Sequence, residues 1–191
     1  HGKSYAAVYE TEHPPGYRWL HESFGTNWRM TEMQAVIGRI QLERMSDWTA
    51  ARTANAHAIL DACAKWEAKG YLSAPRLEES LQFADSTHAY YKLYVYVQSD
   101  HLPEDWSRDR IIQEINEKGV PCFSGSASEV YLEKAFDDTG LRPKSRLPVA
   151  KQLGETSLMF LVHPTLTKDE IAQTVKALDS VLANIDKASQ A

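Results

Sequence analysis

The strongest constraint on the fold is a helix start that the sequence marks twice near residue 31. Thr31 and Gln34 form a capping box, in which the threonine hydroxyl accepts from the N–H of the third helical residue and the glutamine side chain reaches back. Apolar residues then recur three and four positions apart, as on one helix face: Met33, Val36, Ile37 and Ile40. We therefore expect a helix from about residue 31, with these four side chains buried.

The residues just ahead of this helix are compatible with an anion site or with an ordinary turn. A helix N-terminus offers unpaired N–H groups and a partial positive charge, which suit a phosphate or a carboxylate, and Asn27 and Arg29 precede it as directional donors. Equally, Gly25 can form a plain turn that Asn27 caps, while Arg29 pairs with a nearby carboxylate. Because helix N-termini far outnumber anion sites, the residues alone leave both interpretations open.

The same segment carries a motif, G-x-N-x-R-M-T-E-x-Q-A followed by G-R-x-Q-L, over residues 25–42. It resembles the motif of the DegT/DnrJ/EryC1/StrS family of pyridoxal-phosphate (PLP) sugar aminotransferases. The matching positions are Gly25, Asn27, Arg29, Met30, Thr31, Glu32, Gln34, Ala35, Gly38, Gln41 and Leu42. The opening His1-Gly2 pair and the order of segments after Thr87 also follow the family pattern. The resemblance covers essentially the whole chain, but only the second half of a family member.

This resemblance implies the C-terminal part of a PLP-dependent aminotransferase that aminates a nucleotide-linked keto-sugar, with glutamate as amino donor, in polysaccharide or glycoconjugate biosynthesis. It also implies a homodimer whose sites are shared across the subunit interface. In the family, the Asn of the motif reaches the cofactor phosphate of the other subunit, which implies that role for Asn27. Arg29 is implied as a substrate contact, since its planar guanidinium suits a pyrophosphate, although an ion pair with Glu32 or an interface carboxylate would serve it equally well.

A second candidate site is the turn after residue 123. Family members often carry a His-Tyr or similar pair here, whereas this chain has Ser124 and Ser126 on either side of Gly125. Two hydroxyls and two backbone amides suit a substrate phosphate. Glu129 and Tyr131 follow as candidates for contacts with sugar hydroxyls, the alternative being that Tyr131 packs and Glu129 is solvated.

The chain is expected to contain no catalytic residue of its own. PLP transamination needs a lysine that forms a Schiff base with the cofactor and a carboxylate on the pyridine nitrogen. The resemblance places both ahead of His1, and Lys3 follows the His-Gly pair that the family carries downstream of its lysine. The 191 residues alone are therefore expected to be inactive. The alternative is a stand-alone binding or interaction module that kept this domain and lost catalysis, against which the missing initiator Met counts.

Composition excludes several other classes of protein. A net charge of −5 without a Lys/Arg cluster argues against nucleic-acid binding. No apolar stretch approaches the roughly 20 residues that span a bilayer. Cys63 and Cys122 fit no metal-ligand spacing, and the histidines show no paired spacing, so we expect no metal site and two reduced thiols in a cytoplasmic protein.

The rest of the pattern predicts an α+β fold. The first helix is expected to run towards Trp66 and Gly70 and, being long, to bend, to break near Ser46-Asp47 or to bridge two domains. Residues 90–97 alternate as a half-buried strand, with Tyr91, Leu93, Val95 and Val97 on one face and Tyr90, Lys92, Tyr94 and Tyr96 on the other.

Further elements complete a small sheet with helices on one face. Helices are predicted from Ser107 to Gly119, around 129–136, over 149–153 and from Thr167, which forms a second capping box with Glu170. Strands are predicted at 120–123 and 157–162. This arrangement resembles the C-terminal small domain of fold-type I PLP aminotransferases. We expect residues 1–30 as a loop segment on the large domain or dimer partner, 31–70 as a long linking helix and 71–191 as the small domain.

Overall fold

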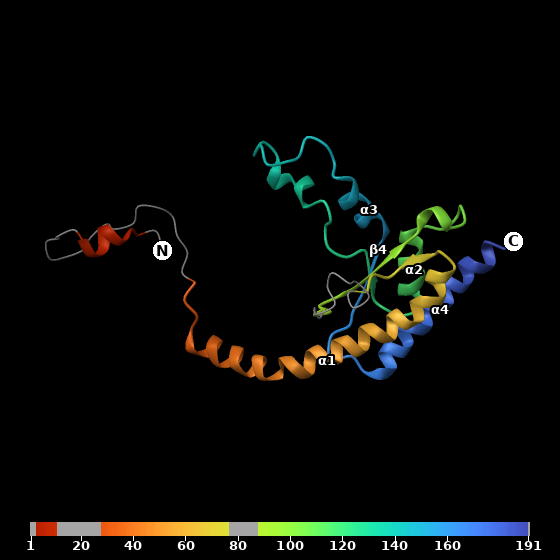
Figure 1. Cartoon of the computed structure of the whole chain (residues 1–191), viewed down its shortest axis with the longest axis horizontal. Helices are drawn as coiled ribbons and strands as arrows, with labels where there is room; N and C mark the ends of the chain where they lie inside the picture. Colours follow the sequence, from red (N-terminus) through yellow and green to blue (C-terminus); the bar gives the residue numbers. More distant parts are fainter. Residues whose placement is uncertain (1–2, 11–27, 77–87, 191) are drawn as a thin grey trace. The chain divides into compact units, whose positions relative to one another are not determined.

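The structure, a computed structural model, describes residues 3–10, 28–76 and 88–190 (Figure 1). The chain divides into two compact units, His1–Arg44 and Met45–Ala191. The first unit contains a short π-helix, η1 (Ala6–Glu10). The ring of Tyr9, in this helix, contacts the ring of Tyr5, just before it, with the two ring centroids 4.8 Å apart. The second unit holds the sheet and the hydrophobic core.

Helix α1 (Glu32–Ala68) begins as the sequence predicts. The Thr31 N–H donates to Gln34 Oε1 at 2.9 Å, and the Gln34 N–H donates to Thr31 Oγ1 at 3.4 Å, so the capping box is confirmed. The helix is unbroken at Ser46-Asp47, because polar residues in a helix interior cost only a few tenths of a kcal/mol each, roughly, and do not by themselves end it. It ends before Gly70, whose φ of 81° only glycine adopts readily.

The prediction that Met33, Val36, Ile37 and Ile40 are buried is wrong for this chain. These side chains are between 42% and 78% exposed. Residues of α1 enter the core only further along the helix, at Ala56, Ile59, Leu60, Cys63 and Trp66. Periodicity indicates which side chains share a helix face, but burial depends on what packs against that face, which the pattern does not encode.

The sheet has four short strands in the order β1-β2-β4-β3, and every neighbouring pair is antiparallel. The strands are β1 (Leu72–Ser73), β2 (Leu93–Val97), β3 (Cys122–Phe123) and β4 (Ser157–Phe160). In the register, Phe160 lies opposite Leu93 on β2 and Cys122 on β3, so β4 is central to the pairing. Strand β1 was not predicted, because two residues are too few to show an alternating pattern.

The predicted alternation of buried and exposed side chains is confirmed within β2, but the two residues before the strand have the opposite burial to the one predicted. Leu93, Val95 and Val97 are buried, as predicted. Tyr90, however, is buried and Tyr91 is exposed. The φ of Tyr90 is +43°, outside the extended region, so the regular pleat begins only after this residue.

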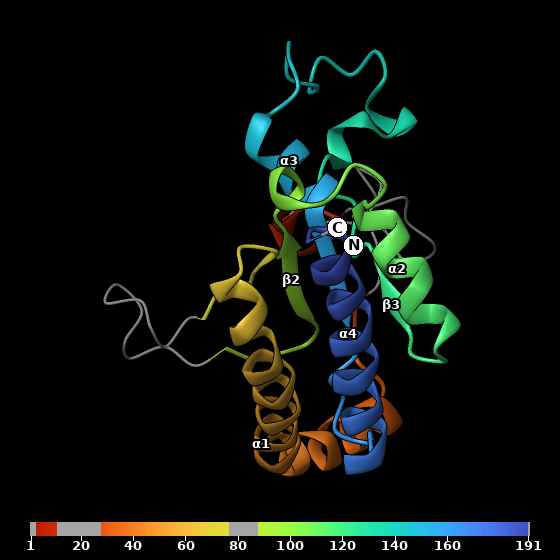
Figure 2. The ribbon, with the colours of Figure 1, turned by 90° about the vertical axis from the view of Figure 1, so that its right-hand side faces the viewer.

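Three helices cover one face of the sheet: the second part of α1, α2 (Arg108–Glu117) and α4 (Lys168–Ala188) (Figure 2). Ser107 caps α2 by accepting from the Arg110 N–H at 3.2 Å, and Thr167 with Glu170 forms the predicted capping box on α4. The core between the helices and the sheet consists of buried apolar side chains, among them Leu60, Val95, Ile111, Leu158, Phe160, Leu178, Leu182 and Ile185. The α+β class with helices on one face is confirmed.

Polar contacts also fasten α1 to α4. Asp179 accepts from Lys65 Nζ at 2.9 Å and from the Trp66 indole N–H at 2.8 Å. About two turns further along α4, Asp186 accepts from Lys69 Nζ at 2.5 Å and from the Tyr71 hydroxyl at 3.2 Å. Each carboxylate thus joins a lysine and an aromatic donor, and the two helices run side by side in both views (Figures 1 and 2).

The prediction of a helix around 129–136 is wrong. The segment forms two short 3-10 turns instead, η4 (Val130–Leu132) and η5 (Lys134–Phe136), separated by an extended Glu133. The Arg142 guanidinium donates to the carbonyls of Tyr131, Leu132 and Glu133 at 2.8, 3.3 and 3.1 Å. An α-helix would need these carbonyls for its own ladder, so the arginine offers them an alternative partner. Beyond this segment, α3 (Pro148–Thr156) leads directly into β4.

Candidate functional site

The predicted site residues fall into two groups along the sequence, one at positions 27–29 and the other at positions 124–131. Asn27 lies outside the described residues. Arg29 is exposed in the first unit, two residues before the helix cap Thr31. The capping box uses the N–H groups of Thr31 and Gln34, whereas the N–H groups of Glu32 and Met33 have no helical carbonyl to bond. The start of α1 therefore presents hydrogen-bond donors and a cation, a donor set that fits the phosphate of PLP.

Ser124 and Ser126 flank a glycine turn that lies against the sheet. The Ser126 N–H donates to the Tyr94 hydroxyl at 3.3 Å, and the Ser157 hydroxyl donates to the Ser124 carbonyl at 2.6 Å. Gly125 has a φ of +88°, and a Cβ there would stand 2.4 Å from Cε1 of Tyr94. Glycine is therefore required both by the backbone conformation and by the close approach of the Tyr94 ring. Both serines are exposed residues on this turn.

The Glu129 carboxylate accepts hydrogen bonds from Tyr131 and from Arg146, a residue that was not predicted from the sequence. The Tyr131 hydroxyl donates to Glu129 Oε1 at 2.6 Å, and Arg146 Nε donates to the same oxygen at 2.9 Å, while a second guanidinium nitrogen reaches Oε2. The Leu147 N–H donates to the Tyr131 hydroxyl at 2.9 Å. Glu129 is thus half-buried in an ion pair. No local signal identifies Arg146, because it lies 17 residues away in the sequence.

Electrostatics fix the charge state of this cluster. The bidentate contact with Arg146, and then the Tyr131 hydrogen bond, lower the pKa of Glu129 to about 2. Glu129 in turn raises the pKa of Arg146, while desolvation, followed by the hydrogen bond to Glu129, raises the pKa of Tyr131. At neutral pH the cluster is a carboxylate, a guanidinium and a neutral phenol. A carboxylate has about four acceptor positions, so Glu129 retains capacity for a further hydroxyl donor.

We expect the Glu129–Arg146 pair to persist in moderate acid. Since the folded-state pKa lies below the ordinary value of 4.5, the stabilisation is complete above that value and is lost as the pH falls through about 2. A pH titration of the Glu129 carboxyl carbon by NMR should give a midpoint near 2, and R146M should move it towards the ordinary value. An unchanged midpoint in R146M would contradict the assigned cause.

Metal-ligating side chains and the two cysteines do not form a site in the described part of the chain. Within residues 3–10, 28–76 and 88–190, no group of three or more His, Cys, Asp or Glu side chains is placed to hold a metal ion. Cys63 and Cys122 are free and buried, and burial is the main cause that raises the pKa of each thiol to about 12. Neither thiol is therefore a candidate nucleophile.

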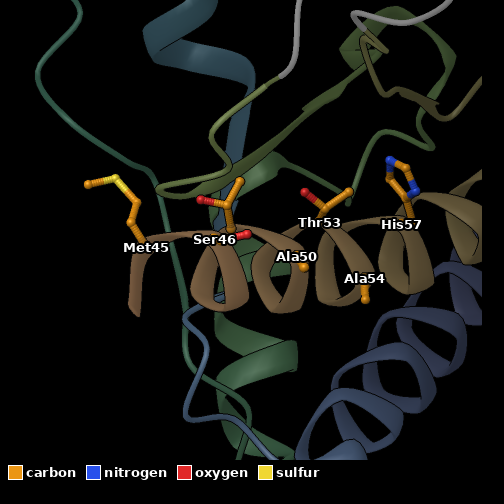
Figure 3. Close-up of a pocket in the computed structure, with 7 residues that line it drawn as sticks. Met45, Ser46, Ala50, Thr53, Ala54 and His57 are labelled. Atoms are coloured by element: carbon orange, nitrogen blue, oxygen red, sulfur yellow. The ribbon is translucent and has the colours of Figure 1, made fainter. Parts of the chain in front are cut away.

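A groove of about 730 Å³ follows one side of α1 (Figure 3). Met45, Ser46, Thr53 and His57 project along it, and Ala50 and Ala54 add small apolar surface. Among the described residues that line the groove, His57 is the only acidic or basic side chain, and the lining includes none of Arg29, Ser124, Ser126, Glu129 and Tyr131.

None of the helices in the described part of the chain has both the length and the apolar character needed to cross a membrane.

Comparison with known proteins gives one consistent result. A model of the DegT/DnrJ/EryC1/StrS aminotransferase family matches residues 8–179. The solved structure of an aminotransferase from Psychrobacter cryohalolentis is 86% identical, with a TM-score of 0.84, over 97% of this chain and 47% of that one.

Two curated relatives agree with this match. The erythromycin biosynthesis sensory transduction protein EryC1 of Saccharopolyspora erythraea is 29% identical over 163 residues, 84% of this chain and 40% of its own length. GDP-perosamine synthase of Caulobacter vibrioides is 28% identical over 173 residues, 88% of this chain and 42% of its own length. The chain thus spans less than half the length of these relatives. With the motif at the start of α1 and the antiparallel sheet below three helices, the match establishes that the chain belongs to the DegT/DnrJ/EryC1/StrS aminotransferase family.

Proposed function

We propose that the chain is the C-terminal part of a cytoplasmic, homodimeric, PLP-dependent aminotransferase that aminates a nucleotide-linked keto-sugar, with glutamate as donor, for polysaccharide or glycoconjugate biosynthesis. The observation that carries the proposal is the family match over residues 8–179. GDP-perosamine synthase, one of the relatives, is named for a nucleotide-linked amino sugar, which supports this class of substrate.

In this proposal, residues near the start of α1 hold the cofactor and the substrate. The Asn27 amide would donate to the PLP phosphate of the other subunit, and Arg29 would donate to the substrate pyrophosphate. Bound PLP supplies the electron sink for proton removal at the amino-bearing carbon. The cofactor lysine belongs to the part of the enzyme that the family carries ahead of His1, so the 191 residues alone are proposed to be inactive.

The second unit supplies polar groups for the sugar nucleotide. The exposed hydroxyls of Ser124 and Ser126 would donate to a phosphate, from a turn held by Tyr94 and Ser157. Glu129 would accept from a sugar hydroxyl while Arg146 keeps it ionised, and Tyr131 would remain the neutral partner that orients the carboxylate. Both contacts are proposed to reach a site shared with the second subunit, and residues 1–30 to lie on the large domain or on that subunit.

The proposal is tested by nitrogen transfer in the full-length protein. Incubation with ¹⁵N-glutamate, PLP and nucleotide-linked keto-sugars should yield a ¹⁵N-labelled amino sugar nucleotide, detected by mass spectrometry. The same sugars without the nucleotide should react poorly, because the phosphate contacts are missing. Transfer to free keto-sugars alone, or to none of the substrates, would refute the proposed function.

We expect N27A in the full-length protein to weaken PLP retention about tenfold, the effect of losing one hydrogen bond to a charged group. Retention is measured as bound cofactor after gel filtration at graded PLP concentrations. The matched control is N184A, which removes an exposed amide from α4. Equal retention by N27A and N184A would remove Asn27 from the cofactor site.

A further inference from the structure

The segment between β3 and β4 is held by polar contacts and not by a hydrophobic core. No residue from 123 to 156, a range that the structure describes throughout, is buried, whereas Cys122 just before it and Ser157 just after it are. The segment projects away from the sheet after β3 and returns to it through α3 (Figure 1). Because no buried apolar surface offsets the entropy cost of ordering it, its conformation depends on its own hydrogen bonds.

Arg142 makes several of these bonds at once. Its Nε donates to the Tyr131 carbonyl at 2.8 Å, and its Nη2 donates to the carbonyls of Leu132 and Glu133 at 3.3 and 3.1 Å. The same Nη2 lies 2.6 Å from Oδ1 of Asp137. The three carbonyls stand at the C-terminal end of η4, where the backbone has no further partner and a cation is favoured.

Two residues close to Arg142 in the sequence bind side chains of the same turn. Arg146 Nε donates to Glu129 Oε1 at 2.9 Å, and the Leu147 N–H donates to the Tyr131 hydroxyl at 2.9 Å. That hydroxyl in turn donates to Glu129 Oε1 at 2.6 Å. Tyr131 therefore connects the two sets of contacts, since Arg142 binds its carbonyl and its hydroxyl orients the Glu129 carboxylate.

The orientation of Glu129 is sensitive to the backbone of this turn. The Glu129 side chain is only 11% exposed, so a ligand can reach its carboxylate from few directions. Hydrogen bonds weaken steeply when they are misaligned, so a small displacement of the carboxylate is enough to lose a ligand. Within the described residues, no contact joins Arg142 directly to Glu129, so any effect of Arg142 on the carboxylate passes through Tyr131.

We propose that Arg142 is a positioning residue for the sugar nucleotide: it fixes the Tyr131 backbone, and through it the direction in which the Glu129 carboxylate meets a sugar hydroxyl. This inference rests on the proposed function, which assigns the sugar contact to Glu129. Arg142 itself binds no substrate in this account. Its loss should therefore weaken the binding of the sugar nucleotide and leave glutamate unaffected.

Steady-state kinetics of the full-length protein test this role against a matched arginine. Arg142 is 36% exposed and Arg110, on α2, is 39% exposed, and each donates to a backbone carbonyl and pairs with a carboxylate. R142M should raise the KM for the sugar nucleotide about tenfold over R110M, the effect of losing one hydrogen bond to a charged group, with kcat and the KM for glutamate unchanged.

The urea unfolding midpoint separates positioning from general stability. It should be equal in R142M and R110M, because the 123–156 segment adds nothing to the buried core. A KM for the sugar nucleotide that is equal in the two variants would overturn the inference. So would an R142M protein that unfolds at lower urea than R110M, or one in which both KM values rise together.

A double variant tests whether Arg142 acts through Glu129. E129Q removes the charge but nearly keeps the shape of the side chain, and it should raise the KM for the sugar nucleotide about tenfold. If Arg142 only orients this carboxylate, R142M/E129Q should raise that KM by clearly less than the product of the two single effects. A full product, about a hundredfold, would show that Arg142 acts independently of Glu129 and would contradict the proposal.

Hydrogen–deuterium exchange separates this inference from the proposed function, because it needs no activity. The N–H groups of Leu132 and Glu133 donate to the carbonyls of Glu129 and Val130 at 2.9 and 3.1 Å. In full-length R142M these amides should exchange about tenfold faster than in R110M, since the turn opens more readily. Equal exchange in the two variants would overturn the inference. Faster exchange in R142M, with no nitrogen transfer by the wild type, would retain the hold of Arg142 on this turn and refute the aminotransferase proposal.

Discussion

F160A is expected to lower the free energy of unfolding by about 3–5 kcal/mol, the usual cost of removing a buried phenyl ring. Phe160 is fully buried and lies on the central strand β4, opposite Leu93 and Cys122. The sheet and the helices α1, α2 and α4 meet at this core, so the cavity cannot close without moving several elements.

The effect is measured as the shift of the urea unfolding midpoint. The control L141A removes a side chain that is 74% exposed and should change stability by less than about 0.5 kcal/mol. A loss below about 1 kcal/mol in F160A would show that β4 is not the centre of the core.

R108M is expected to destabilise the protein by about 1.5–3 kcal/mol, the range for hydrogen bonds to charged groups. The Arg108 side chain is only 15% exposed. Its Nη1 donates to the carbonyls of Gly154 at 3.0 Å and Ser157 at 3.1 Å, which ties the end of α3 to the first residue of β4. Methionine retains much of the apolar stem but leaves both carbonyls without this donor.

A neighbouring arginine provides the matched comparison. Arg110 is 39% exposed and pairs with Asp105 and Glu114, so R110M should destabilise the protein much less than R108M, because exposed ion pairs contribute little to stability. Because Ser157 also holds the Ser124 carbonyl, R108M should further disturb the Ser124–Ser126 turn, seen as shifted amide signals there by NMR. Equal destabilisation by R108M and R110M would contradict the role given to Arg108.

Local signals in the sequence predicted the ends of elements well. Side chains at Thr31, Ser107 and Thr167 cap helices as expected, and Gly119 ends α2 with a φ of +77°. Each of these features depends on groups within four residues of one another, so a short stretch of sequence is enough to predict it.

Features that depend on distant partners could not be predicted. Burial along α1 reverses between Ile40 and Ile59 because only the later turns meet the core. The 129–136 segment is not an α-helix because Arg142, beyond it in the sequence, binds its carbonyls.

The same distinction holds for the candidate site. Ser124, Ser126, Glu129 and Tyr131 were predicted from one segment, which begins where family members often carry a His-Tyr pair. Arg146 was not predicted as the partner of Glu129, because the two residues are 17 positions apart in the sequence. Tyr94 was predicted only as a strand residue, because its contact with the turn crosses 32 positions. Spacing identifies residues that are near in sequence, whereas Tyr94 meets the turn through the pairing of β2, β3 and β4.

The most direct test of the aminotransferase account follows the bound cofactor through both halves of the reaction. The purified full-length protein is loaded with PLP, and its visible absorbance is recorded after glutamate alone and then after a nucleotide-linked keto-sugar. The account predicts that glutamate removes the absorbance of the bound cofactor and that the keto-sugar restores it. Absorbance that responds to neither addition would contradict it.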